Sequence, residues 1–294
     1  MLSKSARFWF AILIAVALLS LAPACGKKSE EEEEEGTTTG TTAGTKYTPT
    51  GNEGTVSGTI AFNGVAPEQR RISMDADPRC AQNNPNPVSE EVIVKNGKLQ
   101  NVFIYIKDGT TSDGKKITDL VFDVPSTPVI LDQKGCHYTP HVVGIQTGQK
   151  LNVTNSDPTT HNINVQPKNN QGFNQAQSEG QAAIVKTFAR AETLIPVKCN
   201  QHPWMKAYIN VLKHPFFAVS GEDGKYEFKG VPPGTYTVVA WHERYGEKTQ
   251  QVKIDPKGSA TVDFTFDAGA ASNGPRSGSL EVLPALELPA VGHH

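Results

Sequence analysis

Four side chains of the types that bind copper occupy one short run and one distant position in the chain. Cys199, His202 and Met205 are spaced by three residues, and His161 lies far upstream of them. A thiolate, two imidazoles and a thioether are the ligands of a blue-copper site, in which a weak axial Met completes trigonal His2Cys coordination. The sequence therefore predicts one type 1 copper ion, held by His161, Cys199, His202 and Met205.

This ligand set needs a strand end, a tight loop and a second strand. Steps of three residues return the chain repeatedly to one centre, and Pro203 stiffens the loop after His202. His161 must arrive from another strand, because a long stretch of sequence separates it from the loop.

Strand signals run through the body of the chain. Residues 55–62 alternate along the chain and end at the turn pair Asn63-Gly64, and residues 102–106 form an apolar run of strand length. Further strand-like runs occupy residues 142–153, 208–212, 216–219, 226–228, 235–241, 251–254 and 260–266. This pattern predicts an all-β protein built from one or two β-sandwiches, with residues 182–194 left ambiguous between a helical turn and a strand.

Residues 138–211 resemble the cupredoxins. The motifs Tyr138-Thr139-Pro140, Val143-Gly144-Ile145-Gln146, Gly148, Asn155-Ser156-Asp157 and His161-Asn162 follow the order of that family. The run from Cys199 to Met205 (CNQHPWM) resembles the short ligand loop of amicyanin and pseudoazurin. The resemblance implies a Greek-key β-sandwich with the four copper ligands named above. It also implies that Asn162 forms hydrogen bonds to the ligand loop and ties it to the His161 strand.

The C-terminal part resembles a second family. The run from Gly221 to Tyr236 (GEDGKYEFKGVPPGTY) is similar to the carboxypeptidase regulatory-like domains, which are small transthyretin-like sandwiches. Their usual first strand is similar to residues 54–60 (GTVSGTI), far upstream. We therefore expect residues 54–110 and 214–268 to belong to one regulatory-like sandwich, with a copper domain at residues 111–213 inserted into it. Two sequential domains are the alternative. The resemblance implies adhesion, scaffolding or carbohydrate contact, and no peptidase activity.

The four cysteines divide by context. If Cys199 binds metal and Cys25 carries lipid, Cys80 and Cys136 are left, and an exported protein is expected to join them in a disulfide. Such a bond contributes about 4 kcal/mol by the chain-entropy estimate. Two independent thiols are the alternative. His137 and His141 also raise the possibility of a second metal cluster, which the use of Cys136 in a disulfide disfavours.

The N-terminal residues predict export. Lys4 and Arg7 precede an apolar run over residues 10–22, so residues 1–24 read as a signal peptide. The run Ala22-Pro23-Ala24-Cys25-Gly26 resembles a bacterial lipobox, and we expect lipidation at Cys25; cleavage by an ordinary signal peptidase is the alternative. Residues 25–53, with glutamate at every position from 30 to 35, and the tail at residues 269–294 are predicted to be disordered. The expected location is the periplasm, on the outer membrane by preference.

These features favour an exported, lipid-anchored type 1 copper protein that transfers one electron to an unidentified redox protein. His202 is expected near the loop surface as the exit route, with Trp204 in a docking patch or packed in the core. One alternative is a surface binding or structural module whose copper site is vestigial or stabilising, and another is copper storage or delivery. We find no enzyme motif and no Cys-x-x-Cys-His haem motif. With a net charge of −2 and no basic cluster after the signal peptide, we do not expect nucleic acid as a partner.

Overall fold

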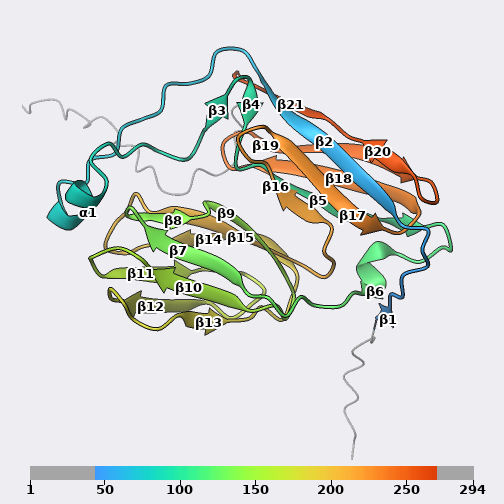
Figure 1. Cartoon of the computed structure of the whole chain (residues 1–294), viewed down its shortest axis with the longest axis horizontal. Coiled ribbons are helices and arrows are strands. Elements are labelled where there is room, and N and C mark those ends of the chain that lie inside the picture. Colours follow the sequence, from blue (N-terminus) through green and yellow to red (C-terminus); the bar gives the residue numbers. More distant parts are fainter. Residues whose placement is uncertain (1–43, 270–294) are drawn as a thin grey trace, which may run out of the picture. The chain divides into compact units, whose positions relative to one another are not determined.

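The computed structural model describes residues 44–269 (Figure 1). The predicted signal peptide, the lipidation site Cys25 and residues 270–294 lie outside the described residues. The described part is almost entirely β and contains one short α-helix, α1 (Pro78–Asn83), and one 3-10 turn, η1 (Ile117–Asp119). No helix in it is both long enough and apolar enough to cross a membrane. The predicted all-β class with two β-sandwiches is confirmed.

The first sandwich is formed by β7–β15. One sheet has the order β13-β10-β7-β8 and the other has the order β12-β11-β14-β15-β9. The strands of the first sheet are β7 (Val129–Lys134), β8 (His137–Thr139), β10 (Leu151–Asn155) and β13 (Ile184–Lys186). Those of the second are β9 (Val142–Gln146), β11 (His161–Val165), β12 (Phe173–Gln177), β14 (Glu192–Lys198) and β15 (Lys206–Leu212). Alternate apolar side chains of both sheets form one buried cluster. The ambiguous segment 182–194 thus supplies β13 and the start of β14.

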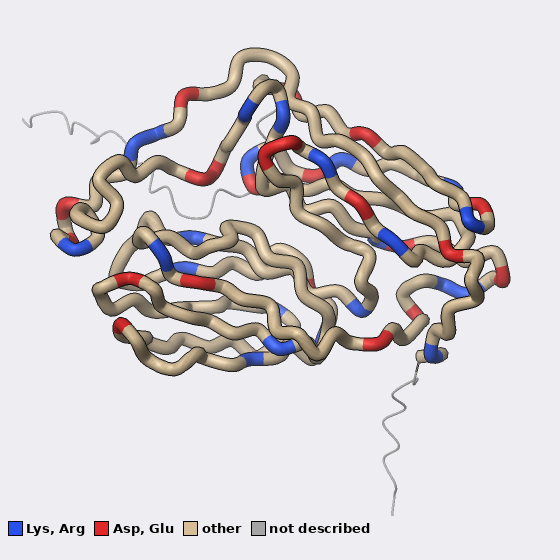
Figure 2. The backbone as a smooth tube through the Cα atoms, viewed as in Figure 1, with Lys and Arg blue, Asp and Glu red and all other residues tan. Residues whose placement is uncertain are grey.

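The second sandwich combines strands that lie before and after the first one in sequence. One sheet has the order β16-β5-β18-β19, and the other has the order β17-β2-β4-β3 with β20 and β21 also paired to β2. Their bounds are β2 (Gly54–Asn63), β3 (Val94–Lys95), β4 (Lys98–Leu99), β5 (Phe103–Thr111), β16 (Phe217–Val219), β17 (Lys225–Val231), β18 (Gly234–His242), β19 (Gly246–Ile254), β20 (Ser259–Thr261) and β21 (Phe264–Asp267). Thus β2 pairs with β17 and β5 pairs with β18 across the whole intervening chain. Lys and Arg are interspersed with Asp and Glu over this sandwich, with no large patch of one sign in the view of Figure 2.

An aromatic cluster joins the two sandwiches, which belong to one compact unit. Phe103 of β5 and Trp241 of β18 pack with Val142 of β9, and the Tyr208 ring lies 5.0 Å from that of Trp241. Gly144 of β9 permits this approach, since a Cβ there would lie 2.5 Å from the Phe217 ring. The junction is therefore a packed apolar contact.

The end of the predicted linker differs from expectation, because residues 44–53 are ordered. The strand β1 (Thr45–Lys46) pairs in parallel with β6 (Leu120–Val121), and the Tyr47 ring lies 5.0 Å from that of Phe122. Glu53 accepts hydrogen bonds from Tyr47 and from the backbone of Thr50. These contacts offset the conformational entropy that residues 44–53 lose when they become ordered. The composition of the segment alone does not predict such contacts.

The segment between β2 and β3 carries α1, where Asp77 caps the helix by accepting from the backbone N–H groups of Arg79 and Cys80. A disulfide joins Cys80 of α1 to Cys136, in the turn before β8. It fixes the segment against the first sandwich.

Candidate metal centre

Neighbouring strands of one sheet bring His161 and Cys199 together. β11 begins with His161, and Cys199 directly follows β14. These strands are antiparallel, with Asn164 opposite Lys198 and Val165 opposite Val197. Continuing that register places the His161 end of β11 beside the loop after Cys199, as the sequence predicts.

Three of the four predicted ligands converge. The Nδ1 atoms of His161 and His202 lie 2.9 Å apart, and the Cys199 sulfur lies 3.7 Å from Nδ1 of His202. The three donor atoms lie within 4.8 Å of one another. All three residues are buried, His161 completely.

Met205 closes the ligand loop. Its backbone N–H donates to the His202 carbonyl (2.9 Å), and its own carbonyl accepts from the N–H of Cys199 (3.3 Å). Its side chain is fully buried in the same core cluster as Cys199. The loop therefore returns to its starting strand within six residues, as the three-residue spacing requires.

Asn162 ties β11 to the ligand loop. Its side-chain oxygen accepts from the backbone N–H of Asn200 (2.6 Å), and its own backbone N–H lies 3.5 Å from the Cys199 sulfur. Its amide group donates to Asn174 of β12 (2.6 Å), which fixes the side-chain orientation. Hydrogen bonds donated to a thiolate sulfur stabilise its negative charge and restrict its position.

A carboxylate holds the outer nitrogen of each imidazole. Asp157 accepts from Nε2 of His161 (2.9 Å), and Asp77 accepts from Nε2 of His202 (3.0 Å). Asp157 also accepts the backbone N–H groups of Gly135 (2.6 Å) and Cys136 (2.7 Å). With Nε2 occupied in this way, both rings present Nδ1 to the centre.

These contacts set the protonation of the metal-free site. Burial alone would raise the pKa of Cys199, but hydrogen bonds from His161 and His202 lower it to about 5. Burial alone would lower the pKa of His161, but its hydrogen bond to Asp157 raises it to about 9. These values favour a thiolate beside a protonated imidazole, and a cation held there would have to displace the imidazole proton.

The expectation that His202 lies near the loop surface is wrong. The residue is only 4 % exposed, with Asp77 bonded to Nε2 and the Cys80 sulfur 3.9 Å from that nitrogen. The ring of Trp204 covers another side at a centroid distance of 5.1 Å. The cause is the segment that carries α1, which the disulfide holds over this edge.

Asp77 and Asp157 are the site residues that sequence reasoning missed. Asp157 stands four residues before His161, so a short-range signal existed. Asp77 is recognisable only once the Cys80–Cys136 disulfide is assumed, because that bond brings its segment to the ligand loop. No comparable signal marks Asp77 on its own.

The donor set fits copper better than a hard cation. Two imidazole nitrogens and one thiolate, with a buried methionine in the same loop, suit copper, whereas magnesium and calcium require oxygen ligands.

Comparison with known proteins gives partial matches. The family model of the carboxypeptidase regulatory-like domain matches residues 200–267. No curated protein matches the chain. Among solved structures, a Cu(I) form of an amicyanin variant is 18% identical to this chain, with a TM-score of 0.26. The match covers 30% of this chain and 86% of the amicyanin chain. A purple cupredoxin from Nitrosopumilus maritimus is 22% identical, with a TM-score of 0.25. The match covers 30% of this chain and 99% of that cupredoxin.

A copper-containing nitrite reductase from Thermus scotoductus is 16% identical, with a TM-score of 0.29; the match covers 53% of this chain and 28% of that enzyme. Because all of these TM-scores lie below 0.5, the ligand assignment rests on the donor geometry. The family match begins at residue 200, inside the ligand loop, and runs to the end of β21.

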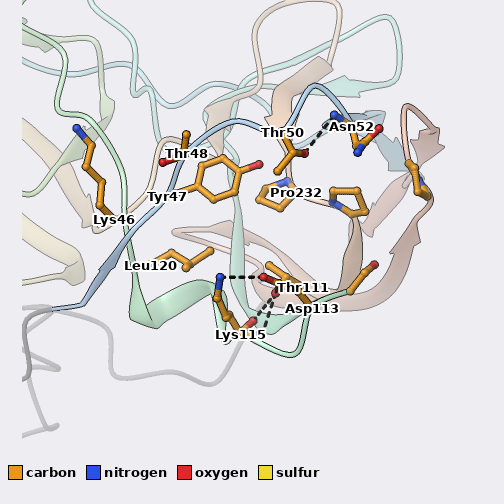
Figure 3. Close-up of a pocket in the computed structure, with 13 residues that line it drawn as sticks. Lys46, Tyr47, Thr48, Thr50, Asn52, Thr111, Asp113, Lys115, Leu120 and Pro232 are labelled. Carbon is orange, nitrogen blue, oxygen red and sulfur yellow. Dashed lines mark hydrogen bonds and ion pairs between the residues drawn. The ribbon is translucent and has the colours of Figure 1, made fainter.

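A separate cavity of about 430 Å³ lies at one end of the second sandwich (Figure 3). Tyr47 and Pro232 supply apolar surface to it, and Lys46, Asp113 and Lys115 supply charge. None of the predicted copper ligands lines it. The cavity and the metal centre are distinct features of the described chain.

Proposed function

We propose that this protein is an exported, lipid-anchored type 1 copper protein that transfers one electron. The observation that carries the proposal is the convergence of the Cys199 sulfur with Nδ1 of His161 and Nδ1 of His202 in a buried site. A copper ion held there would supply a Cu(II)/Cu(I) couple. Rigid placement of donors favours such a couple, because little has to move when the charge changes.

Each residue of the site has a definite part in this proposal. Asp157 and Asp77 fix the ring orientations of the two histidines through Nε2. Asn162 holds Cys199 through its backbone N–H and the loop through its side chain. Met205 is proposed as the weak axial ligand.

Trp204 is partly exposed to solvent, whereas His202 is buried. Its ring packs on His202, it is only partly buried, and its Nε1–H donates to the Cys136 carbonyl (3.1 Å). We place the docking surface of the redox partner at Trp204, in place of an exposed histidine edge.

The visible spectrum of the full chain loaded with Cu(II) tests the proposal. We expect an intense thiolate-to-copper charge-transfer band and one copper ion bound through Cys199. Cys199→Ser should abolish the band, while the matched control His214→Gln, which changes another buried histidine, should retain it. A parent protein that folds and remains colourless after loading contradicts the proposal.

The anchor has its own test. Cys25→Ala should release the protein from the membrane fraction, whereas Cys199→Ser should leave it there. Retention of Cys25→Ala in the membrane fraction would contradict lipidation at this position.

The cavity beside Tyr47 favours a second candidate, a binding module in which copper has only a stabilising part or none. The two candidates differ in thermal unfolding. If metal-free and copper-loaded protein melt at the same temperature and no metal is retained on purification, the binding module is the better reading.

A further inference from the structure

The pairing of β11 with β14 stops short of Asn162, the residue that follows His161. The ladder covers Asn164 and Val165 of β11, and its register would next set Asn162 opposite Asn200. The backbone N–H of Asn200 instead donates to the Asn162 side chain. Asn162 is buried, and buried main-chain groups that remain unpaired are costly. Its backbone N–H and carbonyl therefore need partners other than β14.

Two side chains supply these partners. The backbone nitrogen of Asn162 lies 3.5 Å from the Cys199 sulfur, and the hydroxyl of Tyr138 donates to the Asn162 carbonyl (2.5 Å). Tyr138 belongs to β8 in the opposite sheet, so its side chain reaches β11 across the core of the first sandwich. In an extended strand, the N–H and the carbonyl of one residue point to the same side. A hydroxyl that holds the carbonyl thus also restricts the direction of the N–H.

The surroundings keep the Tyr138 hydroxyl a donor. The residue is completely buried. Burial raises the pKa of Tyr138, and the negative charge of Cys199 raises it further, so the proton stays on the oxygen. The ring lies in the apolar cluster of the first sandwich, where a phenylalanine ring would fill nearly the same space. Packing alone therefore does not account for the hydroxyl.

We propose that Tyr138 is a positioning residue of the metal centre, whose hydroxyl keeps the backbone N–H of Asn162 directed at the Cys199 sulfur; this assignment rests on the proposed copper function. Hydrogen bonding around the cysteine sulfur tunes the reduction potential of such sites. A donor draws electron density away from the sulfur, which favours Cu(I) over Cu(II). Tyr138 thus raises the potential through Asn162, without binding the metal.

Tyr236 of the second sandwich offers a matched comparison. It is also completely buried, and its hydroxyl donates to the Pro232 carbonyl at 2.8 Å. Removing either hydroxyl leaves one buried carbonyl without its donor, so Tyr138→Phe and Tyr236→Phe should lower stability to a similar extent. Of the two tyrosines, Tyr138 is the one bonded to Asn162. A purely structural role would therefore make the two variants alike in every measurement.

The first test uses the metal-free full chain and needs no copper. Amide hydrogen exchange followed by NMR reports the opening of individual N–H groups. The Asn162 rate is taken relative to that of Ile209, in the interior strand β15, so that a change in global stability cancels. This ratio should rise about 5- to 30-fold in Tyr138→Phe and stay unchanged in Tyr236→Phe.

The second test uses the copper-loaded full chain. Tyr138→Phe should lower the reduction potential, measured by voltammetry, and shift the energy of the thiolate-to-copper band, with the same copper content as the parent. Tyr236→Phe should change neither quantity. Circular dichroism establishes that both variants are folded, and urea unfolding measures their loss of stability.

An unchanged exchange ratio at Asn162 in folded Tyr138→Phe overturns the proposal, whatever the copper spectrum shows. An unchanged potential in that variant, or an equal shift in Tyr236→Phe, also overturns it, because the hydroxyl would then serve stability only. If the parent itself develops no band, the proposed copper function fails. The metal-free exchange ratio still decides in that case whether Tyr138 positions the Asn162 N–H.

Discussion

The two sandwiches bury their histidines in different surroundings. In the first, His161 and His202 each have a carboxylate on Nε2, and their Nδ1 atoms converge on a thiolate. In the second, His242 and the adjoining His214 each use Nδ1 to accept a backbone N–H two residues ahead. Burial lowers the pKa of both to about 4. Carboxylate partners prepare a buried histidine for cation chemistry, whereas burial without them makes it a neutral packing residue.

The cores differ in the same way. The interior of the first sandwich contains the fully buried polar residues Asp157, Gln133 and Gln177, with the two glutamines bonded to each other at 2.8 Å. The core of the second is a continuous apolar cluster that includes Phe264 and Phe266. Stability and metal binding should therefore be separable by mutation.

The largest effect is expected from Phe264→Ala in the second sandwich. Phe264 is 2 % exposed, and truncating a buried phenylalanine costs about 3–5 kcal/mol of unfolding free energy. Urea unfolding measures the loss, and the copper spectrum of the folded protein should not change. Val65→Ala, at a site 87 % exposed, is the control and should stay within about 0.5 kcal/mol of the parent. Loss of copper from folded Phe264→Ala would show that the two regions are not separable.

A smaller effect is expected from acid acting on His214. Its pKa is about 4 when folded and about 6.5 when unfolded, so the unfolded chain binds more protons between these values. Stability should therefore fall as the pH drops from about 6.5 to 4, by up to about 3 kcal/mol for this residue. Urea midpoints at pH 7, 5.5 and 4 measure the fall. His214→Gln should show a shallower fall, and an identical pH dependence would exclude His214 as its source.

The sequence brings out the ligand loop because its residues are local. Cys199, His202 and Met205 share one loop, whereas no strand-like run is evident at His161, and its strand β11 is expected only because a distant ligand has to come from another strand. The sequence does not predict the cover over His202, because that depends on a disulfide that joins α1 to a distant turn. The sequence also fails to predict the order of residues 44–53. That order comes from the pairing of β1 with β6 and from the contact of Tyr47 with Phe122, which are both long-range. Contacts between residues far apart in the chain produce no periodicity or motif that a single sequence would reveal.

Asp157→Asn tests whether the carboxylate distinguishes the two kinds of histidine. The change removes a charged acceptor from His161 and from two backbone N–H groups, and should cost about 2 kcal/mol. With a negative charge removed near the centre, Cu(II) is stabilised less than before, and the reduction potential should rise. Voltammetry of the copper-loaded protein measures this shift. Asp132→Asn, which changes a carboxylate bonded to Thr154 in the same sandwich, is the control, and an equal shift in both variants would contradict a direct role.

The smallest effect is expected from Asp77, which both caps α1 and holds His202. Asp77→Ala removes the cap at a cost of about 1 kcal/mol and leaves Nε2 of His202 without its acceptor. Asp77→Asn keeps a capping side chain, so its stability should stay close to that of the parent. Extraction of copper by a chelator should be faster in Asp77→Ala than in Asp77→Asn if the α1 segment shields the centre. Equal extraction rates in the parent and both variants would mean that Trp204 and the disulfide shield His202 without help from this helix.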